Sequence, residues 1–205
     1  MQARGMRTHL IQSRELFGPP DRQAEILECQ KRNEGLFDEY THPEGRPTFT
    51  ELFALCKPDH LNILANSDLY FKLDGAQWLT YVFGRYTDAA RAQRVFALSR
   101  WDVDSEGVEM LWNNGDSQDV WVIYGGPHEI DAPYPMGVPG CDNALIHALR
   151  QAGFEVSNPS KTIRSYHLHL SNYRSYLDGG TGQGRGGVKI ERVPPPYGFC
   201  PPSEL

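Results

Sequence analysis

With 205 residues the chain is long enough for one domain with a substantial core and short for two domains. Its 20 Lys and Arg residues against 26 Asp and Glu residues give a net charge of −6, which provides no overall positive field to collect nucleic acid. A polyanionic partner would therefore need a local basic patch. No apolar run approaches the roughly 18 to 20 residues that cross a bilayer, and the first residues lack the apolar core of a secretory signal. We expect a soluble protein with no transmembrane segment.

The cysteines indicate the compartment. The chain has four, spaced far apart and without a C-x-x-C pair: Cys29, Cys56, Cys141 and Cys200. This spacing argues against a zinc ribbon and against a dense disulfide framework. We therefore expect a cytoplasmic location.

The first third of the chain predicts a strand, a helix, a loop and a second strand. Residues 8–13 have strand composition, and Asp21 is a suitable N-cap for a helix that runs to about Asn33 and stops at Gly35. Residues 37–48 have loop composition, and residues 50–55 predict a short helix. A buried strand then ends at the polar triplet Asn66-Ser67-Asp68.

The middle of the chain contains two more buried strands and one clear helix. Residues 75–84 are mixed in character, and residues 88–93 predict a helical turn. Strands are expected at residues 95–98 and 120–124. Residues 125–140 are rich in Gly and Pro and are expected to form a loop. Apolar residues at helical spacing follow Cys141-Asp142-Asn143 and end at Gly153, which predicts a helix.

Residues 162–170 alternate as a strand does, which places His167 and His169 on the same face. From residue 178 the composition changes to a Gly-rich loop and a Pro-rich tail. We therefore divide the chain into a folded domain at 1–177 and a loop and tail at 178–205.

Strands separated by helices and long loops indicate an α/β domain with a mostly parallel central sheet flanked by helices. Ligands bind such sheets beyond the carboxyl ends of the strands. Polar clusters follow strands or begin helices at four places in the sequence, which are residues 66–68, 99–100, 116–119 and 140–143. This position favours a binding site over a plain surface turn for the triplet at 66–68.

The order of these motifs resembles the nucleotide-sugar glycosyltransferases of the GT-A fold, a Rossmann-like α/β architecture. That family has a D-x-D-type triplet after a central strand, a later acidic motif at a helix start and often a C-terminal histidine that completes a metal site. In this chain NSD, GCD and HLH take these three places. The stretches NSDLYF, ALSRWDV, DSQDVW, GCDNALIHALRQAGFEVSNPS and YHLHLSNYRSY also look like a bacterial and viral branch of such enzymes, and the resemblance covers about Arg22 to Tyr176.

The resemblance implies a divalent metal held by Asp68, His167 and His169. Such a metal acts as a Lewis acid on the pyrophosphate of the donor as the anomeric C–O bond breaks. Hard oxygen ligands suit Mg²⁺ or Mn²⁺, and the imidazoles favour Mn²⁺.

The resemblance also implies catalytic carboxylates. An inverting enzyme needs a base near the acceptor hydroxyl, and Asp142 is the candidate. In a retaining enzyme Asp119 could instead stabilise positive charge at the anomeric carbon. We expect the dipole of the helix that follows Asp142 to lower the pKa of its carboxyl group.

The candidates for binding the donor are residues of the same motifs and the glycine-rich loop after residue 178, which could close over the donor. Guanidinium groups match phosphate oxygens, so arginines are candidate pyrophosphate clamps. The candidate donor-binding residues are Arg22, Asn66, Ser67, Arg100, Gln118 and Arg185.

The partners implied are a nucleotide-sugar donor and a hydroxyl acceptor, which could be a glycan, a glycolipid head group or a hydroxylated DNA base. A DNA acceptor would require a local positive path near the C-terminus. The basic residues available for one are Arg164, Arg174, Arg185, Lys189 and Arg192.

Two other functions stay open. The chain departs from the family pattern at Asn66, where Asp is usual, and at Cys141, where Glu is usual. These departures favour a non-catalytic domain that binds a nucleotide or glycan. A metal-dependent hydrolase using Asp68, His167 and His169 is the third possibility.

Each candidate also has a purely structural interpretation. An N-S-D triplet is common in turns, and Asp142 could serve as a helix N-cap. The histidines could face solvent or complete a polar network, and the arginines could form surface ion pairs. Trp101 and Trp121 are interpreted as core residues.

Overall fold

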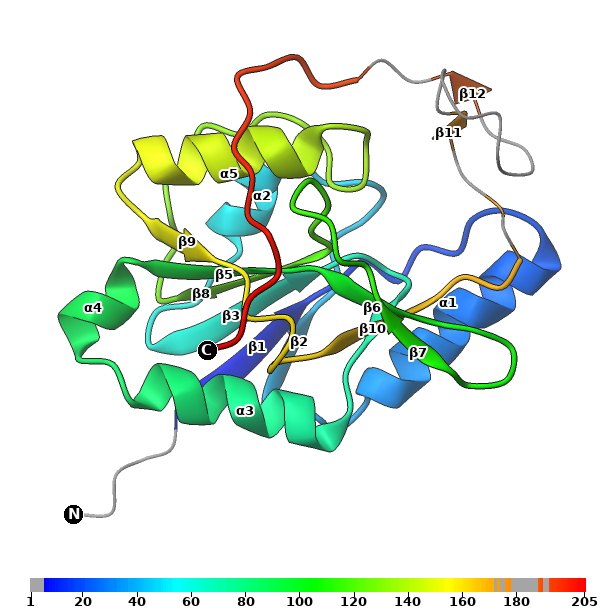
Figure 1. Ribbon diagram of the computed structural model, residues 1–205, viewed down its shortest axis with the longest axis horizontal. Helices are drawn as coiled ribbons and strands as arrows, with labels where there is room; N and C mark the ends of the chain where they lie inside the picture. The colour runs from blue at the N-terminus through cyan, green and yellow to red at the C-terminus, as the bar shows by residue number, and fades with distance from the viewer. Residues whose placement is uncertain (1–5, 172, 174–175, 178–187, 190–191) are drawn as a thin grey trace.

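A computed structural model describes residues 6–171, 173, 176–177, 188–189 and 192–205 (Figure 1). The helices are α1 (Pro20–Asn33), α2 (Phe49–Ala54), α3 (Leu73–Gly84), α4 (Asp88–Ala92) and α5 (Cys141–Gln151). The strands are β1 (Arg7–Ile11), β2 (Glu39–Thr41), β3 (His60–Ala65), β4 (Leu69–Tyr70), β5 (Arg94–Leu98), β6 (Arg100–Val103), β7 (Glu109–Leu111), β8 (Val120–Tyr124), β9 (Glu155–Ser157), β10 (Ser165–Leu168), β11 (Tyr176–Leu177) and β12 (Val188–Lys189).

The predicted α/β class is confirmed, but the expectation of a mostly parallel sheet is wrong. The central sheet has the order β2-β1-β3-β8-β5-β9, and β8 runs antiparallel to both of its neighbours. Parallel neighbours need a long crossover, usually a helix. The chain between β5 and β8 instead forms the strands β6 and β7 and no helix, so it returns in the opposite direction.

A second sheet has the order β4-β10-β6-β7. Strand β6 follows β5 after one residue and pairs in parallel with β10, placing Asp102 opposite His167. Helix α1 packs against β4 and β10. The short strands β11 and β12 pair with each other.

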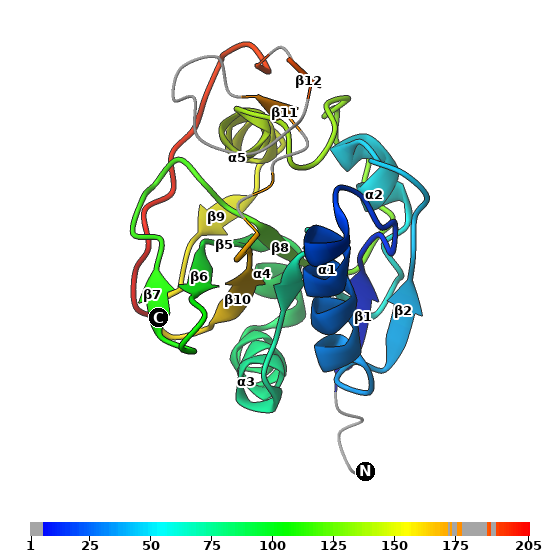
Figure 2. The same cartoon turned by 90° about the vertical axis from the view of Figure 1, so that its right-hand side faces the viewer.

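Helices cover both faces of the central sheet (Figures 1 and 2). Alternate residues of the strands β1, β3, β5 and β8 enter opposite clusters, as Leu64 and Ile63 do on β3. The first cluster joins one face to α2 and α5, and the second joins the other face to α3.

Several element boundaries differ from the sequence-based expectations. The predicted loop at 37–48 contains β2, and the mixed segment at 75–84 is the main part of α3. Asp21 is not the cap of α1: Pro19 holds that position and Asp21 lies in the first turn. Helix α2 is the predicted short helix, and it starts one residue earlier with a capping box between Thr48 and Glu51.

The last residues of the chain pack on the domain. The Gly198 backbone N–H donates to Asn143 O at 2.8 Å, and that of Cys200 donates to Gly115 O at 2.9 Å. Cys200 belongs to the first core cluster. All four cysteines are buried, and none of them is in a disulfide. No helix in the described ranges has the length and apolar character to span a membrane.

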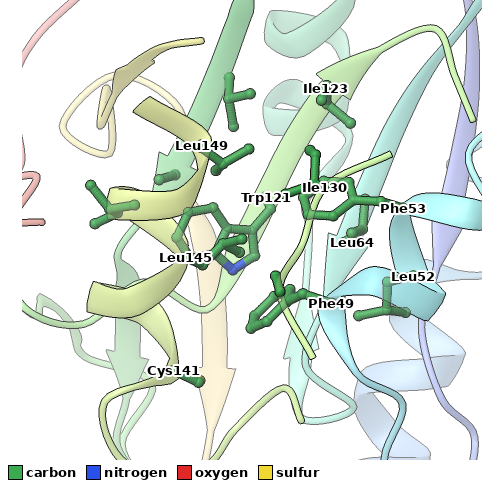
Figure 3. Close-up of a cluster of buried hydrophobic side chains, with 14 of the residues drawn as sticks. Phe49, Leu52, Phe53, Leu64, Trp121, Ile123, Ile130, Cys141, Leu145 and Leu149 are labelled. Atoms are coloured by element: carbon green, nitrogen blue, oxygen red, sulfur yellow. The ribbon is translucent and has the colours of Figure 1, made fainter. Parts of the chain in front are cut away.

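Trp121 of β8 occupies the centre of the first cluster, as the sequence predicts for a core residue (Figure 3). Its side chain lies between α5 and α2, with its ring centroid 5.7 Å from that of Phe49 in an edge-to-face arrangement. This residue therefore connects the sheet to both helices of that face.

Replacing Trp121 by Ala should lower the free energy of unfolding by about 3 to 5 kcal/mol, because the surrounding core cannot close the cavity. Urea unfolding monitored by circular dichroism measures the change. Trp78→Ala on α3 is the matched control, since Trp78 is 42% exposed. Equal losses in the two variants would contradict this account of the core.

Candidate functional site

Polar residues gather at the edge of the central sheet where β1, β3 and β5 end. Because β8 is reversed, the residues that precede it reach the same edge. The Asp119 backbone N–H donates to Leu98 O at 3.0 Å, and its carbonyl accepts from the Asn66 N–H at 3.2 Å. The 116–119 cluster is therefore brought to the site by the start of a strand, not by its end.

The triplet after β3 forms a turn and also faces a cavity. The Leu69 N–H donates to Asn66 O at 3.2 Å, which closes the turn. The side chains of the triplet line a cavity of about 920 Å³, within the usual size range of small-molecule sites. The structural and the binding interpretations of this triplet are therefore compatible.

The cavity is lined by most of the candidate site residues. The candidates that line it include the acids and histidines Asp68, Asp119, Asp142, His167 and His169 and the arginines Arg22 and Arg100. Residues that follow β1 and β2, such as Phe17 and Pro47, also line the cavity.

Asp68, His167 and His169 offer ligand atoms that all lie within 4.8 Å of one another. His167 of β10 and His169, which follows the end of that strand, both line the cavity, as the predicted shared face requires. A carboxylate oxygen with two imidazole nitrogens is a donor set that suits divalent transition metals. These three residues fit a metal ion, and the preference for Mn²⁺ stays a prediction.

The three residues differ in protonation. Despite its burial, Asp68 and Asp102 raise the pKa of His167, so a metal ion would have to displace a proton from that ring. Burial raises the pKa of Asp68, but His167 and Arg22 outweigh it and hold that pKa well below its usual range. Burial, with Arg22 and His167, lowers the pKa of His169 to about 4. At neutral pH His169 is therefore uncharged, and since its Nε2 lies 2.5 Å from Tyr173 O, its Nδ1 keeps the lone pair.

Asp102 is a site residue that sequence reasoning missed. Its carboxylate lies 2.7 Å from His167 Nδ1, while His167 Nε2 lies 3.1 Å from Asp68. A carboxylate behind a ligand histidine orients the ring and increases its basicity. Only the pairing of β6 with β10 could have revealed this contact.

The Arg22 side chain is buried and bonded on several sides, and it does not extend into solvent. Its guanidinium pairs with Asp68, with Glu25 at 2.8 Å and with Leu168 O at 3.0 Å. Its side chain is only 2% exposed. In this arrangement Arg22 fixes the carboxylate of Asp68, and its predicted contact with donor phosphate stays a prediction.

Arg100 connects the residues around His167 to Asp119, which with the neighbouring Asp142 forms an acidic pair. Its guanidinium donates to Asp102 and to Asp119, both at 2.9 Å, and to Ser117 Oγ at 3.1 Å. Asp119 also accepts from Asn66 Nδ2 at 2.9 Å. The carboxylate of Asp119 is thereby fixed from two sides.

Asp142 differs from expectation in two respects. Gly140, at φ +81°, is the N-cap of α5, and Asp142 lies in the first turn. Burial and the neighbouring Asp119 raise the pKa of Asp142 to about 8. The expected lowering by the helix dipole is wrong, because desolvation and like charge exceed it. Cys141 Sγ donates to the carboxylate at 3.1 Å.

The remaining candidates are dispersed. Gln118 does not line the cavity; its amide donates to Gly115 O at 3.3 Å and to Cys200 O at 3.1 Å. Arg192 lines the cavity, whereas Arg164 lies over the ring of Trp101 and pairs with Glu109. Arg174 and Arg185 lie outside the described residues, and the Lys189 side chain is not described.

Comparison of the chain with protein-family models, with curated proteins and with solved structures found no match. The resemblance to GT-A glycosyltransferases therefore rests on the motifs and their placement.

Removal of the Asp68 carboxylate should abolish stabilisation by metal. We expect the melting temperature of the native chain to rise with added MnCl₂ and that of Asp68→Asn to stay constant. In Asp102→Asn the apparent affinity should fall by about 10- to 100-fold, because the ligand His167 loses its orienting partner. Thermal melts across a MnCl₂ titration measure both effects. A native-like response in Asp68→Asn would exclude Asp68 as a ligand.

The raised pKa of Asp142 predicts a pH-dependent cost to stability. The pKa of the Asp142 carboxyl is about 3.8 in the unfolded chain and about 8 in the folded chain. The folded chain is therefore most stable, as far as Asp142 is concerned, below the first value, and it loses this stability as pH rises through the second. Asp142→Asn should therefore gain stability relative to the native chain between about pH 4 and pH 8. Urea unfolding at several pH values tests this, and a difference that does not change with pH would contradict the assigned pKa.

Proposed function

We propose that this chain is a glycosyltransferase of GT-A type that moves a sugar from a nucleotide-sugar donor to a hydroxyl acceptor. The observation that carries the proposal is the convergence of three separate motifs, represented by Asp68, His169 and Asp142, on one cavity. This is the arrangement that the motif order implies. The shared cavity edge gives room for a diphosphate and a sugar beside these groups.

The first role is charge neutralisation. A divalent ion held by Asp68, His167 and His169 would supply Lewis acidity at the leaving diphosphate. Arg22 keeps Asp68 ionised and oriented, and Asp102 fixes the orientation of the His167 ring. These residues keep the ligand set fixed, so little reorganisation is needed when the donor binds.

The second role is proton transfer. Asp142 in its ionised form accepts the proton of the acceptor hydroxyl as that oxygen bonds to the anomeric carbon and the bond to the diphosphate oxygen breaks. With a pKa of about 8, Asp142 is a stronger base than an ordinary carboxylate. Asp119, fixed by Asn66 and Arg100, lines the same cavity and stabilises the positive charge that develops at the anomeric carbon.

A metal-dependent hydrolase is the second candidate, and one observation favours it. Two imidazoles and one carboxylate form the ligand set of many catalytic zinc sites that activate water. Such an enzyme would consume a phosphorylated substrate without any acceptor. The two functions therefore differ in their acceptor dependence.

Incubation with UDP-, GDP- and CMP-sugars, with and without MnCl₂, tests the proposal. We expect nucleotide release that requires an acceptor in the native chain. In Asp142→Asn the rate should fall by roughly 10² to 10⁴, the contribution of a general base, while donor binding measured by thermal shift is retained. Asp131→Asn, an exposed carboxylate outside the cavity lining, is the matched control.

The outcomes separate the candidates. Failure of every donor to bind would end the glycosyltransferase proposal. Acceptor-independent breakdown would favour the hydrolase, and donor binding without turnover would favour a binding domain.

A further inference from the structure

The cavity contains an exposed aromatic ring that the proposed chemistry does not use. Trp112 lies just after β7, is 40% exposed and lines the cavity. The Arg100 guanidinium lies 4.8 Å from its ring centroid, and the Trp112 backbone N–H donates to Arg100 O at 3.0 Å. Because the Arg100 side chain is only 12% exposed, this cation supports the ring from the protein side.

The position of this ring connects it to the acidic pair. Arg100 contacts the ring of Trp112 and also donates to Asp119, and the charges of both Arg100 and Asp119 act on Asp142. A molecule seated on Trp112 would therefore lie close to the proposed base. The rest of the cavity lining, which includes Phe17 and Pro47, is left for the nucleotide.

We propose that Trp112 is the platform for the acceptor, and that the acceptor is a neutral pyranose ring of a glycan. This inference rests on the proposed function, which it deepens by naming the acceptor class. The apolar face of a pyranose packs on an indole ring, while its hydroxyl groups require hydrogen-bond acceptors at the edge.

The groups beside the ring suit hydroxyls and oppose phosphates. Asp116 lines the cavity, is exposed, and forms no hydrogen bond or ion pair with any residue that the structure describes. Its carboxylate can accept hydrogen bonds from sugar hydroxyls. Its negative charge would also repel the backbone of a DNA acceptor.

Saturation-transfer NMR with methyl pyranosides of glucose, galactose, mannose and N-acetylglucosamine tests the platform without requiring turnover. We expect a signal from at least one glycoside with the native chain. Trp112→Ala should weaken the binding about 10-fold, and Trp112→Phe should retain most of it because a ring remains. Trp78→Ala, another exposed tryptophan, is the control and should bind as the native chain does.

The same samples are tested for donor binding by thermal shift with the nucleotide-sugar panel. Donor binding with no glycoside signal, or with equal signals in Trp112→Ala and the native chain, would overturn the platform and leave the proposed function intact. A single-stranded oligonucleotide with a hydroxymethylated base that binds in a Trp112-dependent manner would overturn the pyranose assignment in favour of DNA. Glycoside binding at Trp112 without any donor binding would support the platform and overturn the glycosyltransferase proposal.

Discussion

The reversed pairing of β8 between β3 and β5 is the constraint on which the site depends. Its hydrogen bonds fix Asp119 beside Leu98 and Asn66. Residues that precede β8 therefore meet residues at the ends of β3 and β5. A parallel strand in this position would carry Asp119 to the far edge of the sheet. The same strand contributes Trp121 to the core, so the packing of one face and the position of the acidic pair are set together.

From this edge a continuous chain of charged contacts extends through the cavity. It runs from Arg22 to Asp68, His167, Asp102, Arg100 and Asp119. Each member is partly or fully buried, and leaving one charge without a partner in such surroundings is costly. The arrangement therefore fixes the side chains of Asp68 and His167 before any substrate arrives. Asp142 lies near Asp119, at the end of this chain, and among the described residues no cation forms an ion pair with it.

Local patterns in the sequence were sufficient for some of these features. The two-residue spacing of His167 and His169 predicted a shared face, and the apolar spacing after Asp142 predicted α5. Contacts between distant segments were not accessible in this way. Asp102 meets His167 through a strand register that joins residues 65 positions apart, and the direction of β8 depends on the connection before it. Helix α3 was obscured by Gly75, whose missing side chain allows a close approach to the Arg164 carbonyl.

The four buried, unpaired cysteines have a practical use. They are distributed over α1, α5, the end of α2 and the C-terminal segment, and burial raises the pKa of each thiol, that of Cys56 to about 12. Thiolates are the reactive form, so modification in the native state must wait for local opening. The alkylation rate of each cysteine, measured by mass spectrometry, thus reports how often its region opens locally. No engineered label is needed.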